Sequence, residues 1–202
     1  MPIFNEHKAI FIHIPKCAGT SITDTLDRQN NFKKFINYKD FSLRLMTGRN
    51  LQHSTYSRIK VLHPFKFNSY FKFSFVRNPF DRMYSEYHWR RKWDRTIENK
   101  SFEEMLQEIP TFRNRREPHF KQQTDFIYTK RNKLMVDFVG RFETLEQDFR
   151  NVATELGVKQ IDLKVLNRSR SSTSYRSGYS DQAQELIKQF FAKDLDLLEY
   201  EY

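Results

Sequence analysis

The stretch that most constrains this chain is Ile10–Ile22, because its character changes twice within a few residues. It begins with apolar and β-branched residues, which predict a buried strand. Pro15 cannot donate a hydrogen bond to a neighbouring strand and therefore ends this one. Small residues follow, and then Ile22 and Leu26 share one face, as they do in a helix. The stretch therefore predicts a strand, a tight loop and a helix.

This order of elements favours a bound phosphate at the loop. A helix N-terminus presents unpaired backbone N–H groups and the positive end of the helix dipole, and both attract anions. Lys16 adds a mobile cation, and Thr20 and Ser21 add hydroxyl donors. The ordinary P-loop ends in Gly-Lys-Ser/Thr, whereas here Lys16 precedes Gly19. We therefore expect a phosphate site that differs from the ordinary P-loop.

A second motif, Phe75–Ser85, joins another strand to another helix. Residues 70–76 carry Phe at every second position, which predicts the strand. Asn78 and Pro79 are typical of a helix start, since Asn caps the first turn and Pro suits the first helical position. Arg77, at the strand's carboxyl end, can make a forked, charge-assisted contact with a phosphate. Standing alone, the motif would better fit a surface arginine and a serine on a helix face.

Strands alternate with helices along the rest of the chain. The predicted strands cover residues 8–14, 70–76 and 136–142, and the predicted helices cover residues 19–29, 79–93 and 144–156, a segment after the capping box at Ser101 and a final segment after Ser180. The basic stretch Arg113–Lys121 is expected to be a loop. No repeat and no Pro/Gly-rich linker is visible. The pattern predicts one α/β domain over residues 1–202, with a central, mainly parallel sheet flanked by helices.

The composition excludes several other classes of protein. In 202 residues, 38% are hydrophobic and 30% charged, which is typical of a folded, soluble chain, and no apolar run reaches transmembrane length. The single cysteine, Cys17, excludes an intramolecular disulfide and a cysteine-based zinc cluster. The formal net charge of +10 attracts anions such as nucleotides, acidic glycans, nucleic acids or lipid headgroups, although it can also serve solubility alone.

The Ile-Pro-Lys-x-Ala-Gly-Thr-Ser loop and the Val-Arg-Asn-Pro motif, in this order, resemble the two phosphate-binding motifs of sulfotransferases. These enzymes use 3′-phosphoadenosine 5′-phosphosulfate (PAPS) as the sulfonyl donor. The likeness is strongest to the carbohydrate (type 2) branch that includes heparan 2-sulfotransferases, and it extends loosely over residues 9–200. It implies a P-loop-like three-layer fold. It also implies that the 5′-phosphosulfate contacts Pro15, Lys16, Cys17, Ala18, Gly19, Thr20 and Ser21, and that the 3′-phosphate contacts Arg77 and Ser85. Cys17 is often Thr in this family, a departure of little consequence where only backbone and a small side chain are needed.

The resemblance also suggests a catalytic base. The heparan 2-sulfotransferases carry a His-x-Ser/Thr-Tyr-like segment between the two motifs, and Gln52–Tyr56 occupies that position. His53 would then accept the proton of the acceptor hydroxyl, a task that suits imidazole because its pKa lies near neutrality. The alternative is a turn histidine just before a short helix capped by Ser54. His13 is a weaker candidate, expected within the first strand.

Three further segments, residues 122–126, 139–148 and 167–175, extend the resemblance. In the family they flank the acceptor cleft, pack the sheet and close over the nucleotide, so Tyr175 would contact the donor. The stretch Leu166–Tyr179 is rich in Ser, Arg and Tyr and equally fits a flexible linker.

The predicted reaction moves the sulfonyl group of PAPS to an acceptor hydroxyl and releases PAP. Lys16 and the loop N–H groups would neutralise charge on the leaving 5′-phosphate, and no metal is required. The branch and the positive charge favour a glycan or glycolipid acceptor. The start of the chain lacks a signal peptide or anchor, so we expect a cytoplasmic, bacterial enzyme.

Two other functions are alternatives to sulfonyl transfer. An ATP-dependent small-molecule kinase would need a Gly-Lys-Ser/Thr order and a metal-binding Asp after a strand, and neither is found. A nucleic-acid-binding module is favoured by the charge and by the Arg/Ser/Tyr tract. It leaves the order of Lys16, Arg77 and Ser85 unexplained.

Overall fold

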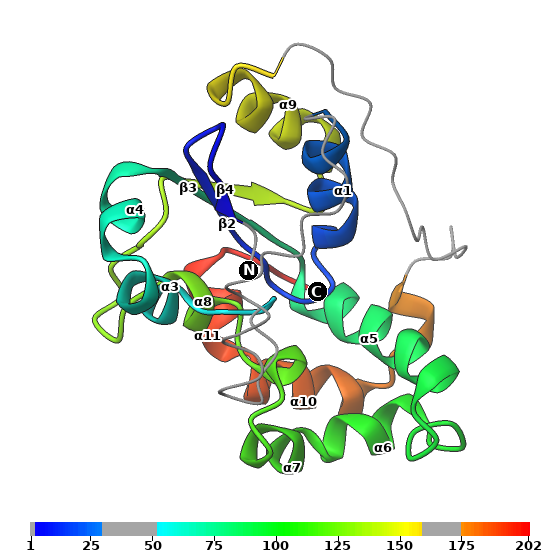
Figure 1. Ribbon diagram of the computed structural model, residues 1–202. Coiled ribbons are helices and arrows are strands. Elements are labelled where there is room, and N and C mark those ends of the chain that lie inside the picture. Colours follow the sequence, from blue (N-terminus) through cyan, green and yellow to red (C-terminus); the bar gives the residue numbers. More distant parts are fainter. Residues whose placement is uncertain (1–2, 30–51, 159–174) are drawn as a thin grey trace. The chain divides into compact units, whose positions relative to one another are not determined.

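The computed structural model describes residues 3–29, 52–158 and 175–202, which form two compact units (Figure 1). The first unit contains Met1–Val76 and Asp125–Leu166, and the second contains Arg77–Thr124 and Asn167–Tyr202. Of the tract at 166–179, only residues 175–179 are among the described residues.

The first unit is built around one sheet. Its strands are β1 (Ile3–Phe4), β2 (Ala9–Ile12), β3 (Phe71–Val76) and β4 (Phe138–Arg141), which lie side by side in that order. β1 is antiparallel to β2, whereas β2 and β3, and β3 and β4, are parallel. The predicted α/β fold with a mainly parallel sheet is confirmed. The observed strands are one to three residues shorter than predicted, and His13 lies just beyond the end of β2.

The centre of the sheet is closely packed and aromatic. All four residues of β2 are buried, as expected for a continuous apolar run covered on both faces. The rings of Phe11 and Phe73 stack with centroids 5.0 Å apart. A Cβ added at Gly140 would lie only 2.4 Å from the ring of Phe75, so the close approach of β4 depends on this glycine. The Ser74 hydroxyl donates to the Ile12 carbonyl at 2.8 Å, which satisfies a buried polar group.

Helices flank this sheet. They are α1 (Gly19–Gln29), α3 (Tyr56–Leu62), α4 (Pro64–Ser69) and α9 (Leu145–Glu155), and α8 (Thr124–Ile127) begins at the boundary of the unit. In Figure 1, α1 and α9 lie on one side of the sheet and α3 and α4 on the other. The bounds of α1 agree with the prediction. The proposed cap at Ser54 is wrong: Thr55 precedes α3 and makes no side-chain cap, and Ser54 is buried instead.

The second unit consists of helices and short 3₁₀ turns. They are α5 (Pro79–Trp93), α6 (Phe102–Gln107), α7 (Ile109–Asn114), η1 (Pro118–Phe120), η2 (Tyr175–Gly178), α10 (Asp181–Phe190) and α11 (Ala192–Leu197). The predicted caps at Asn78 and Ser101 are confirmed by side-chain bonds to backbone N–H groups, and Ser180 caps the predicted final helix in the same way. The loop expected over residues 113–121 is partly wrong, because its start completes α7 and its centre forms η1. No helix in the described residues is long and apolar enough to cross a membrane.

The core of this unit is formed around α5. Phe80, Met83 and Tyr87 are buried there, at positions that share one face of a helix. Arg82, a charged residue of the same helix, is also completely buried. Its guanidinium carbon lies 5.3 Å from the centroid of the Phe191 ring, and its Nη2 donates to the Lys121 carbonyl at 2.7 Å. A cation–π contact and a charge-assisted hydrogen bond thus offset part of the cost of burying this charge.

Candidate functional site

The loop between β2 and α1 has an unusual backbone. Lys16 and Ala18 both adopt left-handed conformations, with φ of 68° and 59°. Such a conformation costs a residue with a Cβ roughly 1–2 kcal/mol and is found where the surrounding structure enforces it, often at a functional site. Alternating backbone conformations of this kind form concave nests of N–H groups that bind anions. The Ile22 N–H then donates to the Ala18 carbonyl at 3.1 Å, which begins α1 directly behind the loop.

The side chains of the loop divide into two groups. Pro15, Cys17, Gly19 and Ser21 are buried, whereas Lys16 and Ala18 are half-buried and Thr20 is exposed. The Cys17 thiol donates to the Pro15 carbonyl at 3.5 Å, which braces the turn from within. The cation and one of the two hydroxyls predicted from the sequence are therefore accessible to a ligand.

His13 lies against the start of α1. Only 4% of its surface is exposed, and its ring stacks on Phe11 with centroids 5.4 Å apart. A Cβ built on Gly19 would come within 1.8 Å of the His13 Nε2. Gly19 is therefore required by the space that the imidazole occupies.

His53 meets His13 from the other direction. Its Nδ1 lies 3.0 Å from the His13 carbonyl oxygen, and the two rings meet edge to face with centroids 4.5 Å apart. A carbonyl oxygen only accepts, so the hydrogen is on Nδ1 and the lone pair of the neutral ring is on Nε2. This is the tautomer that a proton-accepting base needs. The structure thus brings His53 close to the loop between β2 and α1 through one intervening residue, His13, although His53 lies 40 positions further along the sequence.

Arg77 directly follows β3 and belongs to the second unit. Its side chain is almost completely buried, and its Nε donates to the Asp81 carboxylate at 2.7 Å. The amide of Gln123 binds both main-chain groups of Arg77: the Arg77 N–H donates to Oε1 at 2.9 Å, and Nε2 donates to the Arg77 carbonyl at 2.7 Å. The position of Arg77 is therefore defined at its backbone and at its guanidinium.

Two other predicted residues lie in the same unit as Arg77. Ser85 is half-buried on α5. The Tyr175 hydroxyl accepts a hydrogen bond at 3.4 Å from the Asn78 amide, which also donates to the Glu201 carbonyl at 2.7 Å. Tyr175 therefore contacts the second phosphate motif at the residue that caps α5.

Sequence reasoning missed Gln123 as a partner of Arg77, and it missed Asp194 entirely. Asp194 is completely buried in α11, and its carboxylate accepts from the backbone N–H groups of Gln123 and Thr124 at 2.7 and 2.9 Å. Burial raises the pKa of Asp194. Gln123 had been noted only as part of a segment similar to the family, and an isolated Asp in a short amphipathic helix gives no signal.

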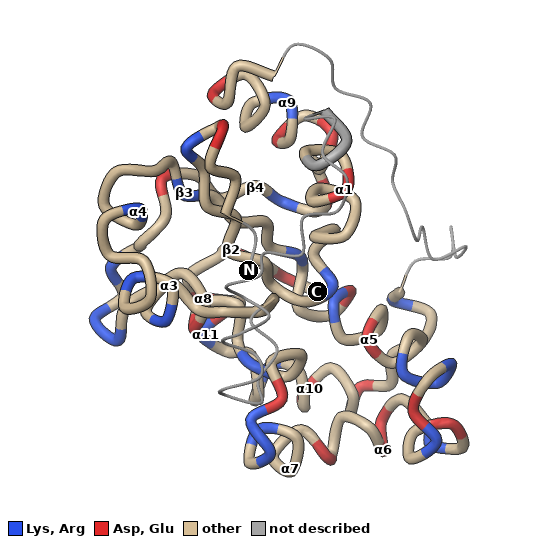
Figure 2. The backbone as a smooth tube through the Cα atoms, in the orientation of Figure 1, with Lys and Arg blue, Asp and Glu red and all other residues tan. Residues whose placement is uncertain are grey.

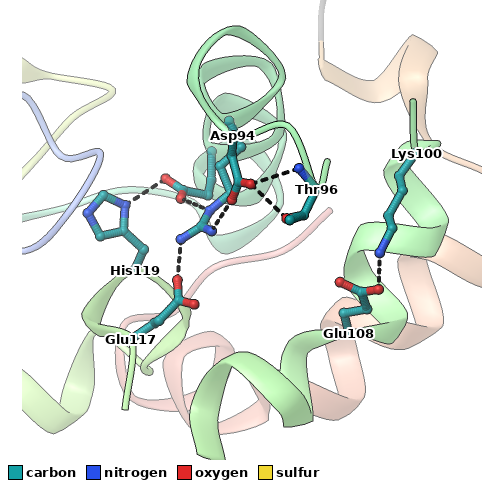
Figure 3. A network of polar contacts seen from close by, with 8 residues as sticks. Asp94, Thr96, Lys100, Glu108, Glu117 and His119 are labelled. Atoms are coloured by element: carbon teal, nitrogen blue, oxygen red, sulfur yellow. Dashed lines mark hydrogen bonds and ion pairs between the residues drawn. The ribbon is translucent and has the colours of Figure 1, made fainter. Parts of the chain in front are cut away.

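A second group of charges in this unit stabilises the helices (Figure 3). Glu86 is completely buried on α5 and accepts from Arg90 at 2.7 Å and from His119 at 2.8 Å. Burial raises the pKa of Glu86, but the hydrogen bonds and charges of His119 and Arg90 outweigh it and lower this pKa to about 2. The Arg90 guanidinium also lies over the rings of Phe112 and Phe120, 4.9 and 4.7 Å from their centroids. These contacts fix α5 next to α7 and η1.

Comparison with known proteins gave two matches. A family model described as the sulfotransferase family matches residues 2–201, which include both phosphate motifs. An uncharacterised protein of Archaeoglobus fulgidus is 30% identical over 110 residues, which make up 54% of this chain and 86% of that protein. No solved structure matches the chain.

Proposed function

Because the chain belongs to the sulfotransferase family, we propose that it transfers the sulfonyl group of PAPS to an acceptor hydroxyl and releases PAP. The observation that carries this proposal is the family match over both motifs, each placed where a strand passes into a helix. Residues 1–202 would then act as one sulfotransferase domain.

The loop residues would hold the 5′-phosphosulfate end of the donor. Their chemistry fits this group, since Lys16 supplies a cation, Thr20 a hydroxyl and the left-handed loop its backbone N–H groups. Lys16 would also neutralise charge that grows on the leaving 5′-phosphate. This interaction lowers the activation barrier only if it is stronger in the transition state than with the bound donor. Pro15, Cys17, Ala18, Gly19 and Ser21 shape and support this loop.

Arg77 and Ser85 would hold the 3′-phosphate, the group that distinguishes PAPS from ATP. A guanidinium makes forked contacts with phosphate oxygens, and a hydroxyl adds one further donor. Tyr175, which contacts Asn78 beside Arg77, would contribute to the same end of the nucleotide.

His53 would act as the base. In the tautomer set by the His13 carbonyl, Nε2 accepts the proton of the attacking hydroxyl. The acceptor oxygen forms its bond to sulfur as the bond between sulfur and the bridging oxygen breaks, and the proton remains on His53 until it passes to solvent. The sulfonyl group itself carries no proton, so one base is sufficient.

The resemblance of the two motifs to the carbohydrate branch and the net charge of +10 support a glycan or glycolipid hydroxyl as acceptor. The cytoplasmic location and bacterial source stay predictions. The charge also favours nucleic acid as a partner, but Figure 2 shows acidic residues interspersed with basic ones along the helices of the second unit.

The proposal is tested by thermal shift and by transfer. At about 100 times its dissociation constant, a ligand stabilises the folded state by about 2.7 kcal/mol. PAP should raise the melting temperature well above the effect of ATP or single-stranded RNA at the same concentration. Radiolabelled sulfur from PAPS should then appear on members of a panel of glycan and glycolipid acceptors. A larger shift with RNA than with PAP, and no transfer to any acceptor, would overturn the assignment.

A further inference from the structure

Arg77 directly follows β3, and a side chain binds its main chain. In a sheet, the N–H and C=O of a residue pair with a neighbouring main chain. At Arg77 both groups pair with one side chain, the Gln123 amide, at 2.9 and 2.7 Å. Gln123 is completely buried, so these bonds are shielded from competing water.

Gln123 is itself fixed. Its backbone N–H donates to the Asp194 carboxylate at 2.7 Å, and the next residue donates to the same carboxylate through its N–H and its hydroxyl, both at 2.9 Å. Arg82 supplies a nearby positive charge that favours the ionised carboxylate. Buried, charge-assisted bonds of this kind are among the stronger ones in a protein. A continuous series of bonds therefore runs from Asp194 through Gln123 to the main chain of Arg77.

We propose that Gln123 is a positioning residue for recognition of the donor's 3′-phosphate: its amide sets the main chain of Arg77, and thereby the direction of the guanidinium. The inference rests on the proposed function, in which Arg77 binds that phosphate. The Nε bond from Arg77 to Asp81 at 2.7 Å defines the far end of the side chain, and Gln123 defines the near end. A forked contact with a phosphate requires that both ends of the side chain are fixed, because the contact depends on the angle of the guanidinium as well as on its distance.

The chain provides a matched control next to this residue. Gln122 has the same side chain, and its Oε1 is buried without a hydrogen-bond partner among the described residues. Gln122→Met therefore removes an amide of the same size without removing a bond from that oxygen. Gln123→Met removes both bonds to Arg77 and keeps the length of the side chain.

The test compares PAP with AMP, which differ only in the 3′-phosphate. Calorimetry gives the two dissociation constants. The dissociation constant of AMP divided by that of PAP is the ratio that measures recognition of the 3′-phosphate. Gln123→Met should weaken PAP binding about tenfold or more and leave AMP binding unchanged. The contact that it disturbs is the one between the Arg77 guanidinium and the 3′-phosphate, and a hydrogen bond that involves a charged group contributes of that order. Gln122→Met should leave the ratio at the wild-type value.

Two further variants separate positioning from a structural role. In an Arg77→Ala background, Gln123→Met should change the ratio no further, because both act on one contact. Gln123→Glu keeps an acceptor for the Arg77 N–H and loses the donor to its carbonyl, so it should lower the ratio less and provides a readout if the Met variant does not fold. Equal weakening of PAP and AMP, or an unchanged ratio with a lower melting temperature, would overturn the inference. If Arg77→Ala itself left the ratio unchanged, the assignment of Arg77 under the proposed function would fail instead.

Discussion

Replacing Gly19 with alanine should disable the donor loop by steric conflict alone. The new methyl group would lie 1.8 Å from the His13 Nε2, whereas real Cβ contacts essentially never fall below 3.0 Å. The imidazole or the start of α1 must therefore move by about 1.2 Å. The imidazole has little room, since it is stacked on Phe11 and its Nδ1 accepts from the Gln52 amide at 3.4 Å.

The expected cost follows from this displacement. Overpacking of a buried site typically destabilises by about 1–3 kcal/mol. A misplacement of about 1 Å in a catalytic site lowers the rate by about a hundredfold. We therefore expect Gly19→Ala to lower turnover at saturating PAPS by about that factor and to weaken PAP binding, as measured by initial rates and calorimetry. The variant should still melt cooperatively.

Gly157→Ala is the matched control. Gly157 has a φ of 68°, and an added Cβ would meet nothing within 4 Å, so the substitution strains the backbone without crowding any side chain. It should lose about 1–2 kcal/mol of stability and keep its turnover. Adding His13→Ala to Gly19→Ala should restore part of the PAP affinity because it empties the contested space. Wild-type turnover and PAP affinity in folded Gly19→Ala would refute the reasoning.

Three other predictions concern single side chains. Lys16→Ala should lower turnover at saturating PAPS by about a hundred- to a thousandfold; a rise in KM alone would make Lys16 a ground-state binder. His53→Ala should keep PAP affinity, lower turnover by about a hundred- to ten-thousandfold, and abolish the wild-type loss of rate at acid pH. His88 is an exposed histidine of α5, and His88→Ala should leave the rate near normal. Glu86 has a pKa of about 2 in the folded protein against an ordinary 4.5, so its ionised form adds stability above pH 4.5 that is lost as the pH falls toward 2. Thermal melts from neutral pH to pH 2 should therefore show that Glu86→Gln is less stable than the wild type by on the order of 3 kcal/mol near neutrality. The stability of the variant should also fall less as the pH is lowered, and a variant with the wild-type acid profile would contradict this.

The local elements could be predicted because their causes are local. The apolar run before Pro15 predicted β2, and the caps at Asn78, Ser101 and Ser180 predicted the starts of α5, α6 and α10. Each depends on residues a few positions apart, where propensity and capping chemistry act directly.

What the sequence could not supply was contact between distant residues. Gln123 and Arg77 are 46 positions apart, and Gln123 and Asp194 are 71 apart, so no spacing rule links them. Helical periodicity treats a charged residue such as Arg82 as exposed, whereas an aromatic ring and a carbonyl make its burial possible. The meeting of His53 with His13 likewise depends on tertiary structure.

The build of α5 limits how this sequence can change in length. The helix carries Ser85 between Met83 and Tyr87, so a residue proposed to bind the donor lies among residues that form the core. One inserted or deleted residue turns every later position of a helix by about 100°. Such a change would move Ser85 away from Asn78 and, in the same step, turn Tyr87 out of the core. Insertions and deletions in this helix are therefore opposed by folding as well as by recognition, and the spacing of the motif should be kept even where its individual residues are substituted.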